Sequence, residues 1–254
     1  MSTYDFAAQR LFVDAPLNEG ARVAPAPTAQ NYLLNVLRLR DGDPILLFNG
    51  RDGEWLARIE MVSRRAAALI VEKLLRRQTV AGQLEYAFAP LKQARLDYMV
   101  QKAAEMGAAR LTPVLTRRTQ VRRVNIERLR ANVIEAAEQC GLLNAPEIGA
   151  AQELEDWLAA LPADRLLVFC DEDAAVEDPV AALRGSAPSQ EGRIVAAAIS
   201  LLIGPEGGFE PSERGLILQK SNVLRLSLGP RILRADTAAV AALALVQAVF
   251  GDWR

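Results

Sequence analysis

Short apolar runs alternate with segments of helical period from residue 84 to the end of the chain, and this alternation constrains the fold more than any other feature. The apolar runs cover residues 84–91, 110–116, 164–173, 194–203 and 222–229. Apolar residues at helical spacing follow at 95–107, 124–141 and 236–251. Strands and helices that alternate in this way pack as a parallel sheet with helices on both faces. The sequence therefore predicts an α/β fold for this part.

Two of the predicted helices carry recognisable ends. Asn125 is placed to cap the middle helix, and Gly141 is placed to end it. The C-terminal helix is expected to be capped by Asp236 or Thr237, and it is apolar nearly all round from Ala238 to Phe250. A helix of this kind is buried on several sides. We expect a partner subunit to supply part of that cover; burial within its own domain is the alternative.

The first 78 residues have a different, β-rich pattern. Short apolar strands are predicted at 44–50, 54–62 and 66–75, and a turn cluster, Asn49-Gly-Arg-Asp-Gly53, joins the first two. Strands of this length and spacing indicate a small barrel or sandwich. Residues 29–40 have helical spacing. The polar segment that follows Arg76 predicts a domain boundary, so we expect one domain at 1–78 and a second at 79–254.

Composition excludes several classes of site. The 254-residue chain has no histidine, which excludes a Ser-His-Asp triad and a histidine-ligated metal. Its two cysteines, Cys140 and Cys170, match no metal-ligand spacing, so we expect buried free thiols and no metal. No basic leader with an apolar core begins the chain, and no apolar run reaches about 18 residues. We therefore expect a cytoplasmic protein without a membrane segment.

Charge is distributed unevenly along a chain whose net charge is −1. Ten basic and three acidic residues lie between Lys92 and Arg130, whereas thirteen acidic and two basic residues lie between Glu135 and Glu191. A basic block in a neutral protein favours an anionic partner such as RNA, although a solvated helical face is the alternative. The expected phosphate-binding arginines are Arg117, Arg118, Arg122 and Arg123, extended by Arg38, Arg40, Arg64 and Arg65.

Glycine-rich loops follow three of the predicted parallel strands. One strand leads into Gly-Pro-Glu-Gly-Gly at 204–208, another into Leu-Gly-Pro-Arg at 228–231, and a third ends at Asp171. The first loop lacks the lysine and hydroxyl of a P-loop, and its glycine spacing is not the dinucleotide fingerprint. Ligands of parallel sheets bind at the carboxyl ends of the strands. Glycines among apolar residues there suit a flat, mostly apolar ligand such as an adenosine.

The two longer loops carry a specific resemblance. LLIGPEGGFEPSE followed by LSLGPRILRADTAAVAAL is similar to the signature of the SPOUT methyltransferases. Within that class the chain resembles the ribosomal RNA small-subunit methyltransferase E family, which methylates uridine N3 in 16S ribosomal RNA. The segments RLFVDAPL, NVLRLRDGDPILLFNGRDGEW, QKAAEMGAARLTPVLTRRTQV and EAAEQCG resemble other parts of that family, so the likeness extends over most of the chain.

The resemblance implies an architecture and a set of partners. It implies a small PUA-like RNA-binding β-barrel at 1–78 and a SPOUT domain at 79–254, with a C-terminal trefoil knot from about residue 203. It implies S-adenosyl-L-methionine as cofactor and a homodimer formed through the knot and the C-terminal helix. It also implies 16S ribosomal RNA as substrate, within the assembled small ribosomal subunit.

The resemblance also implies residue roles. The expected cofactor-binding residues are Phe169, Ile203, Gly204, Glu206, Gly207, Gly208, Leu228, Gly229 and Leu233. Arginine suits the stabilisation of the anion that forms when uridine N3 loses its proton. Arg234 is the first candidate and Arg231 the second, with phosphate binding alone as the alternative for both. Arg10 from the partner's barrel is expected to position the RNA, with structural pairing as the alternative. Glu206 either contacts the cofactor or caps the following helix. Glu206, Asp236 and solvent remain open as proton acceptors.

Three positions depart from the family pattern. Tyr32 stands where a histidine is frequent, Leu142 where an arginine is common, and Asp236 where a glutamate is usual. The first two positions are expected on the RNA-facing surface, so they affect the expected context of the target.

Three other functions remain open. The chain could be a knotted methyltransferase with another target, ribose 2′-oxygen or transfer RNA. It could be a non-catalytic RNA-binding assembly factor, although two intact glycine loops argue against this. An unrelated nucleotide-binding α/β protein is disfavoured by the missing phosphate motifs.

Overall fold

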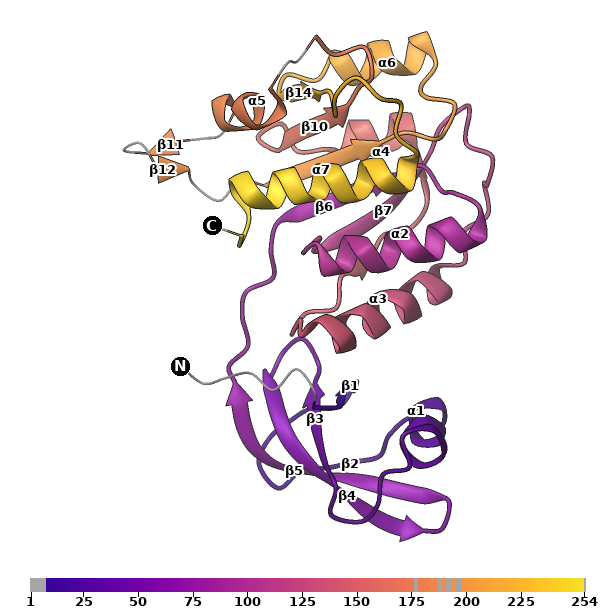
Figure 1. Ribbon diagram of the computed structural model, residues 1–254, viewed down its shortest axis with the longest axis vertical. Helices are drawn as coiled ribbons and strands as arrows, with labels where there is room; N and C mark the ends of the chain where they lie inside the picture. The colour runs from indigo at the N-terminus through magenta and orange to yellow at the C-terminus, as the bar shows by residue number, and fades with distance from the viewer. Residues whose placement is uncertain (1–7, 176–177, 187–188, 191–192, 195–197, 254) are drawn as a thin grey trace. The chain divides into compact units, whose positions relative to one another are not determined.

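The chain forms two compact units in the computed structural model, which describes residues 8–175, 178–186, 189–190, 193–194 and 198–253. Unit 1 comprises Met1–Ala81 together with Ala137–Ala145, and unit 2 comprises Gly82–Ala136 and Pro146–Arg254. The sequence pattern placed a boundary after residue 78 and did not indicate that residues 137–145 group with the first unit. Figure 1 shows the elements of each unit along the chain.

Unit 1 contains a five-stranded sheet with the strand order β1-β3-β4-β5-β2. The strands are β1 (Arg10–Phe12), β2 (Arg22–Val23), β3 (Pro44–Phe48), β4 (Glu54–Ser63) and β5 (Ala66–Arg76). β1 pairs with β3 in parallel, and the other pairs are antiparallel. The predicted strands of this region are therefore confirmed. Their inward side chains, such as Leu47 and Leu69, build the core of the unit.

The helix predicted at 29–40 is shorter and of a different kind. A short helix, α1 (Pro27–Asn31), continues into one π-helical turn, η1 (Tyr32–Val36). The amide of Leu37 donates to the carbonyl of Tyr32, five residues earlier, at 2.9 Å. Arg38 then has a φ of 57°, which a right-handed helix does not allow, so the helix ends before it.

Unit 2 is built on a parallel sheet with the strand order β14-β10-β13-β6-β7-β8. The strands are β6 (Leu84–Phe88), β7 (Arg110–Leu115), β8 (Glu147–Ile148), β10 (Leu166–Cys170), β13 (Ile199–Ile203) and β14 (Val223–Leu226). Every neighbouring pair along this path is parallel, and β9 (Gln152–Glu153) pairs with the end of β7. The predicted parallel sheet is confirmed. The strand predicted at 194–203 is shorter, and residues 195–197 lie outside the described part of the chain.

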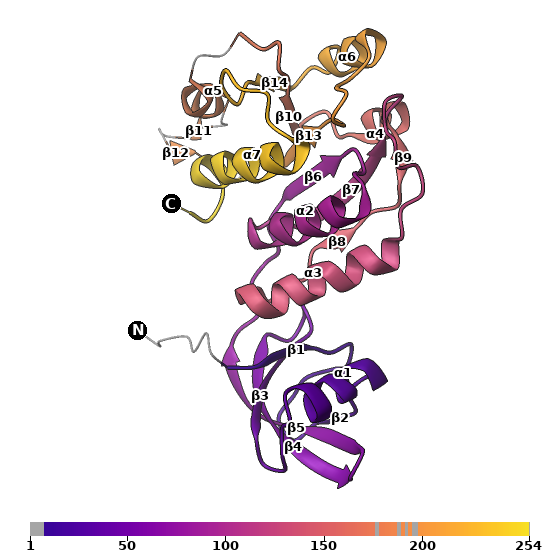
Figure 2. The ribbon, with the colours of Figure 1, turned by 45° about the vertical axis from the view of Figure 1, so that its right-hand side comes forward.

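Helices cover both faces of this sheet (Figures 1 and 2). One face packs against α2 (Gln93–Glu105), α3 (Ile126–Cys140), α5 (Pro179–Gly185) and α7 (Ala235–Phe250). The other face packs against α4 (Leu154–Ala160) and α6 (Pro211–Leu218). Tyr86 and Phe88 of β6 point to the first face, and Ala87 between them points to the second. This alternation is why the central strands β6 and β13 are apolar on both faces, apart from the buried Glu85 and Ser200.

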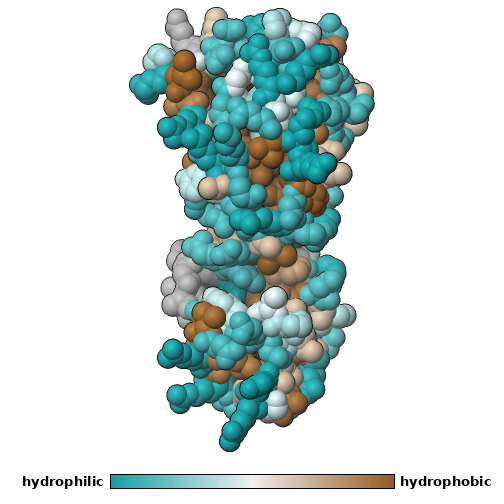
Figure 3. Space-filling view, turned by 90° about the vertical axis from the view of Figure 1, so that its right-hand side faces the viewer, coloured by the Kyte–Doolittle hydropathy of each residue, from teal (hydrophilic) through white to brown (hydrophobic). Residues whose placement is uncertain are grey.

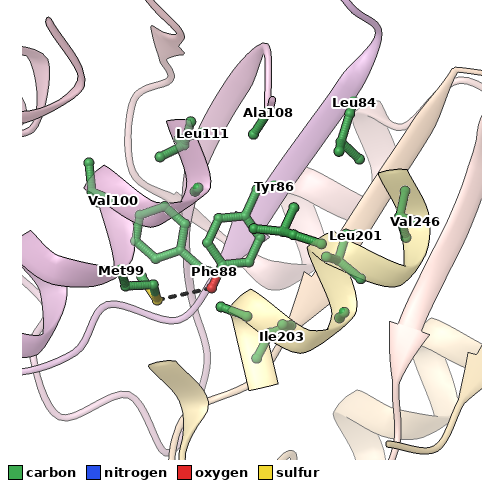
Figure 4. Close-up of a cluster of buried hydrophobic side chains, with 14 of the residues drawn as sticks. Leu84, Tyr86, Phe88, Met99, Val100, Ala108, Leu111, Leu201, Ile203 and Val246 are labelled. Atoms are coloured by element: carbon green, nitrogen blue, oxygen red, sulfur yellow. Dashed lines mark hydrogen bonds between the residues drawn. The ribbon is translucent and has the colours of Figure 1, made fainter. Parts of the chain in front are cut away.

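The core under α2 and α7 is closely packed around Tyr86 (Figure 4). Tyr86 is fully buried, and its hydroxyl donates to the sulfur of Met99 at 2.9 Å. Burial raises the pKa of Tyr86 well above its usual value, so the phenol stays neutral. Its ring stacks on Phe88 with centroids 5.2 Å apart. The group is therefore a structural part of the core.

The C-terminal helix α7 begins at Ala235 after the cap residue Arg234 and ends at Gly251. The prediction that Asp236 or Thr237 caps it is wrong by two or three residues. α7 packs against α2, α5 and β13, which cover one side of it. Its other side, with Ala244 and Leu245, is half-buried. Among the residues that the structure describes, no helix is long and apolar enough to cross a membrane.

Gly107 ends α2 in a conformation that a side chain would disturb. Its φ is +77°, and an added Cβ would clash with Nε2 of the buried Gln247, which donates to the Met106 carbonyl at 2.7 Å. We expect Gly107→Ala to lower the free energy of unfolding by about 1–3 kcal/mol, measured by denaturant titration. As a control, Gly215→Ala meets nothing within 4 Å inside α6, and it should raise stability by up to about 1 kcal/mol. Wild-type stability of Gly107→Ala would contradict this packing.

Candidate active site

A cavity of about 310 Å³ lies at the carboxyl ends of three strands of unit 2. The strands are β14, β10 and β13, which are neighbours in the sheet, and all run in the same direction. Its walls come from the segments that follow these strands, at 170–173, 204–209 and 227–233. Parallel strands bring their ends to one edge of the sheet, so loops far apart in sequence meet there.

Glycines leave the backbone of these loops open to the cavity. Gly229 has a φ of +97°, and a Cβ added there would meet nothing within 4 Å. Gly208 also has a positive φ, of +68°, which favours glycine. A Cβ at Gly204 would come within 2.5 Å of the Phe209 ring, which packs edge-on against Phe169. The three glycines therefore allow the backbone of these loops to turn, and Gly229, which has no side chain, also leaves room for a ligand.

The lining combines apolar and charged side chains. Its apolar members include Ile203, Leu226, Leu228 and Leu233. The charged members are Asp171, Glu172, Asp173, Glu206, Arg214 and Arg231. A cavity with apolar walls and a carboxylate-rich rim suits a ligand that has a flat apolar part and a cationic part.

Asp171 is the most buried charged residue of the lining, with 5% of its surface exposed. Its Oδ2 accepts from Arg225 Nε at 2.7 Å and from Arg214 Nη2 at 3.0 Å. Burial opposes ionisation, but the hydrogen bonds from Arg214 and Arg225 outweigh it, so the pKa of Asp171 lies below its usual value. The sequence pattern identified this strand end but gave Asp171 no role. Neither arginine is near it in sequence, so no local signal indicated the pairing.

Cys170 also lines the cavity, immediately before Asp171. Burial raises the pKa of the Cys170 thiol to about 12, with a smaller effect from the neighbouring carboxylate. The thiol is therefore protonated at neutral pH, and it is not a thiolate nucleophile. Cys170 is a free thiol, as predicted, but Cys170 and Cys140 are both half-buried, whereas fully buried thiols were expected. In the described part of the chain, no group of three or more acidic, histidine or cysteine side chains is arranged to hold a metal ion.

Eight of the nine residues expected to bind the cofactor line the cavity. They are Phe169, Ile203, Gly204, Glu206, Gly208, Leu228, Gly229 and Leu233. The ninth, Gly207, is exposed, and its carbonyl accepts from Arg118 Nη1 at 2.7 Å. Gly207 therefore belongs to the outer side of the loop.

Glu206 does not cap α6, which was one of its two expected roles. Its carboxylate lies 3.5 Å from Arg95 of α2, and it lines the cavity. Glu210 is the N-cap residue of α6 instead, and the Glu213 carboxylate accepts from the Glu210 amide at 2.9 Å. This reciprocal arrangement is a capping box. The role of Glu206 toward a cofactor stays a prediction.

The two arginines predicted for catalysis are placed differently. Arg231 is exposed and lines the cavity. Arg234 is exposed at the N-terminal end of α7 and is not among the lining residues of the described chain. Asp236, also outside the lining, accepts from the amide of Thr237 at 2.9 Å. Arg231 therefore lines the cavity and Arg234 does not, and the catalytic role of either stays a prediction.

Arg10 is buried in unit 1, and this corrects its expected role. It is 8% exposed, and its Nε donates to Glu54 at 2.7 Å. Its other nitrogens donate to the carbonyls of Ala137, Glu138 and Leu142. A guanidinium whose donors are used in this way is not available to RNA, so we assign Arg10 a structural role. Leu142 is half-buried against a small apolar cluster of unit 1, and its expected RNA-facing position stays a prediction.

All eight arginines expected to bind phosphate are exposed, four in each unit. Those of unit 1 are Arg38, Arg40, Arg64 and Arg65, and those of unit 2 are Arg117, Arg118, Arg122 and Arg123. Acidic residues distant in sequence neutralise part of the basic block, because Arg122 pairs with Glu153 at 2.6 Å and Arg128 pairs with Asp97 at 2.6 Å. Figure 3 shows hydrophilic residues over much of one face, with apolar patches between them.

Comparison with known protein families identifies the class of protein to which this chain belongs. Residues 78–247 match the family model of an RNA methyltransferase domain, and residues 28–72 match that of an RNA methyltransferase PUA domain. The chain is therefore a member of the RNA methyltransferases, with a PUA-like segment ahead of the parallel sheet.

Individual relatives narrow the class to one family. The chain is 33% identical over 239 residues to the ribosomal RNA small subunit methyltransferase E of Rickettsia conorii, with 94% of each chain covered. It is 30% identical to the Synechocystis protein of the same name, over 87% of this chain and 72% of the relative. The chain belongs to the ribosomal RNA small subunit methyltransferase E family.

Solved structures share the fold. The Neisseria gonorrhoeae member of the family, bound to S-adenosyl methionine, is 26% identical and superimposes with a TM-score of 0.81, over 97% of this chain and 100% of that one. A protein of Legionella pneumophila, solved with the cofactor SAM, is 29% identical with the same TM-score, over 95% and 97% of the two chains.

Proposed function

We propose that this chain transfers the methyl group of S-adenosylmethionine to N3 of a specific uridine in 16S ribosomal RNA. The observation that carries the proposal is the glycine-lined cavity at the ends of β10, β13 and β14, in a chain that belongs to the methyltransferase E family. Membership of the family indicates the reaction, and the cavity indicates where in this chain the reaction takes place.

The residues present fit S-adenosylmethionine. Leu228 and Ile203 offer apolar walls for an adenine ring, and the open backbone at Gly229 allows close approach. Glu172 and Asp173 also line the cavity, and their carboxylates would suit the cationic part of such a ligand. When bound, S-adenosylmethionine supplies an electrophilic methyl group on a positively charged sulfur. Alignment of that methyl group with the nucleophile is most of what the protein must provide.

Arg231 is the residue that we assign to the chemistry of the uridine. Uridine N3 carries a proton and becomes a good nucleophile only when it loses it, with the negative charge spread onto O2 and O4. A guanidinium at the cavity stabilises that anion by charge-assisted hydrogen bonds. Glu206 is the first proton acceptor to test, because it lines the cavity and Asp236 does not. Solvent is the alternative acceptor.

The finer architecture is also part of the proposal. We propose that the sheet of unit 1 forms a PUA-like RNA-binding barrel and that unit 2 is the catalytic domain, with a trefoil knot from about residue 203. In support of the knot, β14 lies at the sheet edge beside β10, whereas α7, which follows β14 in the chain, packs on β13 and α2. The half-buried side of α7 and the 94% exposed Ile232 support a homodimer through this region. The proposed setting is the cytoplasm, on the assembled small subunit.

The exposed arginines of the segment 117–123 are proposed to bind the RNA backbone. Replacing Arg122 and Arg123 together by alanine should weaken binding of a 16S fragment, and the slope of log K against log salt should fall by about one for each phosphate that the variant no longer binds. Filter binding across a salt series measures both quantities. Arg130→Ala is a matched control, because that exposed arginine pairs with an acidic residue at 2.6 Å, as Arg122 does, but lies on α3 outside the segment 117–123. An unchanged slope of log K against log salt in the double variant would contradict the proposal that this segment binds the RNA backbone.

Calorimetric titration with S-adenosylmethionine tests the proposal first, with ATP and NAD titrated separately. Saturable binding of S-adenosylmethionine alone supports the cofactor assignment. Methylation of small subunits in vitro, followed by mass spectrometry of the nucleosides, then identifies the methylated atom. N3-methyluridine supports the proposed target, whereas a ribose methyl group or a product only in transfer RNA supports another target. Binding of RNA without binding of S-adenosylmethionine would indicate a non-catalytic assembly factor.

A further inference from the structure

Asp171 joins the three segments that wall the cavity. Its own segment follows β10, whereas Arg214 lies on α6, just after the glycine loop 204–208, and Arg225 lies on β14, just before the loop 227–233. Asp171 is the shared acceptor of both arginines, with Arg214 Nε also 3.3 Å from Oδ1. One carboxylate therefore connects the segments that carry all three walls.

The turn after β10 is fixed by the same group. The Asp171 amide donates to the carbonyl of Leu226 at 3.0 Å, which holds the ends of β10 and β14 together. The Asp173 amide donates back to Asp171 Oδ1 at 3.2 Å, and Arg225 Nη2 donates to the Asp173 carbonyl at 2.7 Å. Arg225 thus binds both ends of the short segment 171–173, which is one wall of the cavity.

We infer that Asp171 is a positioning residue for the methyl donor, which holds the glycine loop and the 227–233 loop at the separation that the cofactor requires. This inference rests on the proposed function. The Asp171 carboxylate accepts from Arg214, Arg225 and the Asp173 amide, so it acts through these groups. Its removal also leaves two arginine charges beside a cavity that receives a cationic ligand, which adds repulsion to the loss of geometry.

Asp97 provides a matched control elsewhere in unit 2. Its carboxylate accepts from Arg128 Nε at 3.0 Å, from Arg128 Nη2 at 2.6 Å and from Asn132 at 2.8 Å. Like Asp171, it connects two elements, here α2 and α3, through an arginine. It does not line the cavity. The variants Asp171→Asn and Asp97→Asn therefore remove the same kind of interaction, one at the cavity and one away from it.

The test compares wild type with both variants, by calorimetry with S-adenosylmethionine and by steady-state kinetics on small subunits. We expect Asp171→Asn to raise Kd and KM for S-adenosylmethionine by about tenfold or more, with kcat at saturating cofactor within about threefold of wild type. Asp97→Asn should leave Kd and KM within about twofold, because exposed ion pairs contribute little and this one is remote from the cavity.

Three results would overturn the inference: unchanged affinity in folded Asp171→Asn, an equal loss in Asp97→Asn, or a fall of kcat with KM unchanged. If Asp171→Asn does not fold, Arg225→Lys keeps the charge but removes the second bond, to the Asp173 carbonyl. Its KM for S-adenosylmethionine should rise by about threefold or more, and an unchanged KM would overturn the inference. Failure of wild type to bind S-adenosylmethionine would instead contradict the proposed function.

Discussion

Glu54→Ala should lower the free energy of unfolding of unit 1 by about 3–5 kcal/mol, the largest stability effect that we expect in this chain. Glu54 is 1% exposed and accepts from Arg10 at 2.7 Å and from Arg76 at 2.7 and 2.8 Å. Its removal leaves the buried Arg10 guanidinium without a counter-charge. Denaturant unfolding followed by circular dichroism, with hydrogen exchange to locate the effect, measures the loss.

Glu60→Ala on the same strand, β4, is the control. Glu60 pairs with Arg22 at 3.1 Å, but both side chains are about half exposed, so the expected loss is below about 1 kcal/mol. Equal losses in the two variants would contradict the assignment of the buried cluster.

The effect of Glu54 should also depend on pH. Burial opposes its ionisation, but hydrogen bonds from Arg76 and Arg10 outweigh burial and hold the pKa of Glu54 below its ordinary value of 4.5. Its contribution is therefore complete above pH 4.5 and is lost as the pH falls through the lower pKa of the folded state. The difference between wild type and Glu54→Ala should shrink over that acid range.

Arg231→Ala should lower kcat for methylation by about 10²–10³-fold, with a much smaller change in affinity for S-adenosylmethionine. The reason is that an anion on the uridine develops only as N3 loses its proton, so the arginine acts mainly on the transition state. Single-turnover assays on small subunits separate the chemical step from binding.

Arg234→Ala is the control for this prediction, because Arg234 is also exposed but lies outside the cavity lining. We expect its loss of rate to be below about tenfold. A larger loss of rate in Arg234→Ala than in Arg231→Ala would indicate that Arg234 is the catalytic arginine.

The parallel sheet and the loops that wall the cavity could be predicted from the sequence because their signals are local. An apolar run that ends in glycines identifies both a buried strand and an open turn, as at Ile203 and Gly204. Because the turn follows the strand in the sequence, it must lie at the carboxyl end of that strand. Six lining residues were predicted in this way: Ile203, Gly204, Gly208, Leu228, Gly229 and Leu233.

The parts that could not be predicted depend on contacts distant in sequence. Arg10 was expected to be available for RNA, but one of its acceptors, the Ala137 carbonyl, is 127 residues away, and a backbone acceptor leaves no side-chain signal. Asp171 meets Arg225 only because β14 pairs with β10. The positive charge of the basic block is likewise smaller in the structure than its run of arginines suggests, since Glu153 and Asp97 pair with two of those arginines.

The discontinuous make-up of unit 1 constrains the order in which the chain matures. Residues 137–145 belong to this unit, and their carbonyls accept from Arg10. A ribosome delivers residues 82–136 of the other unit before this segment emerges, so the N-terminal unit is completed only in the second half of synthesis. A fragment that stops near residue 81 would lack these acceptors. For the same reason, transfer of residues 1–81 into another protein as one consecutive piece would separate Arg10 from the carbonyls that accept from it.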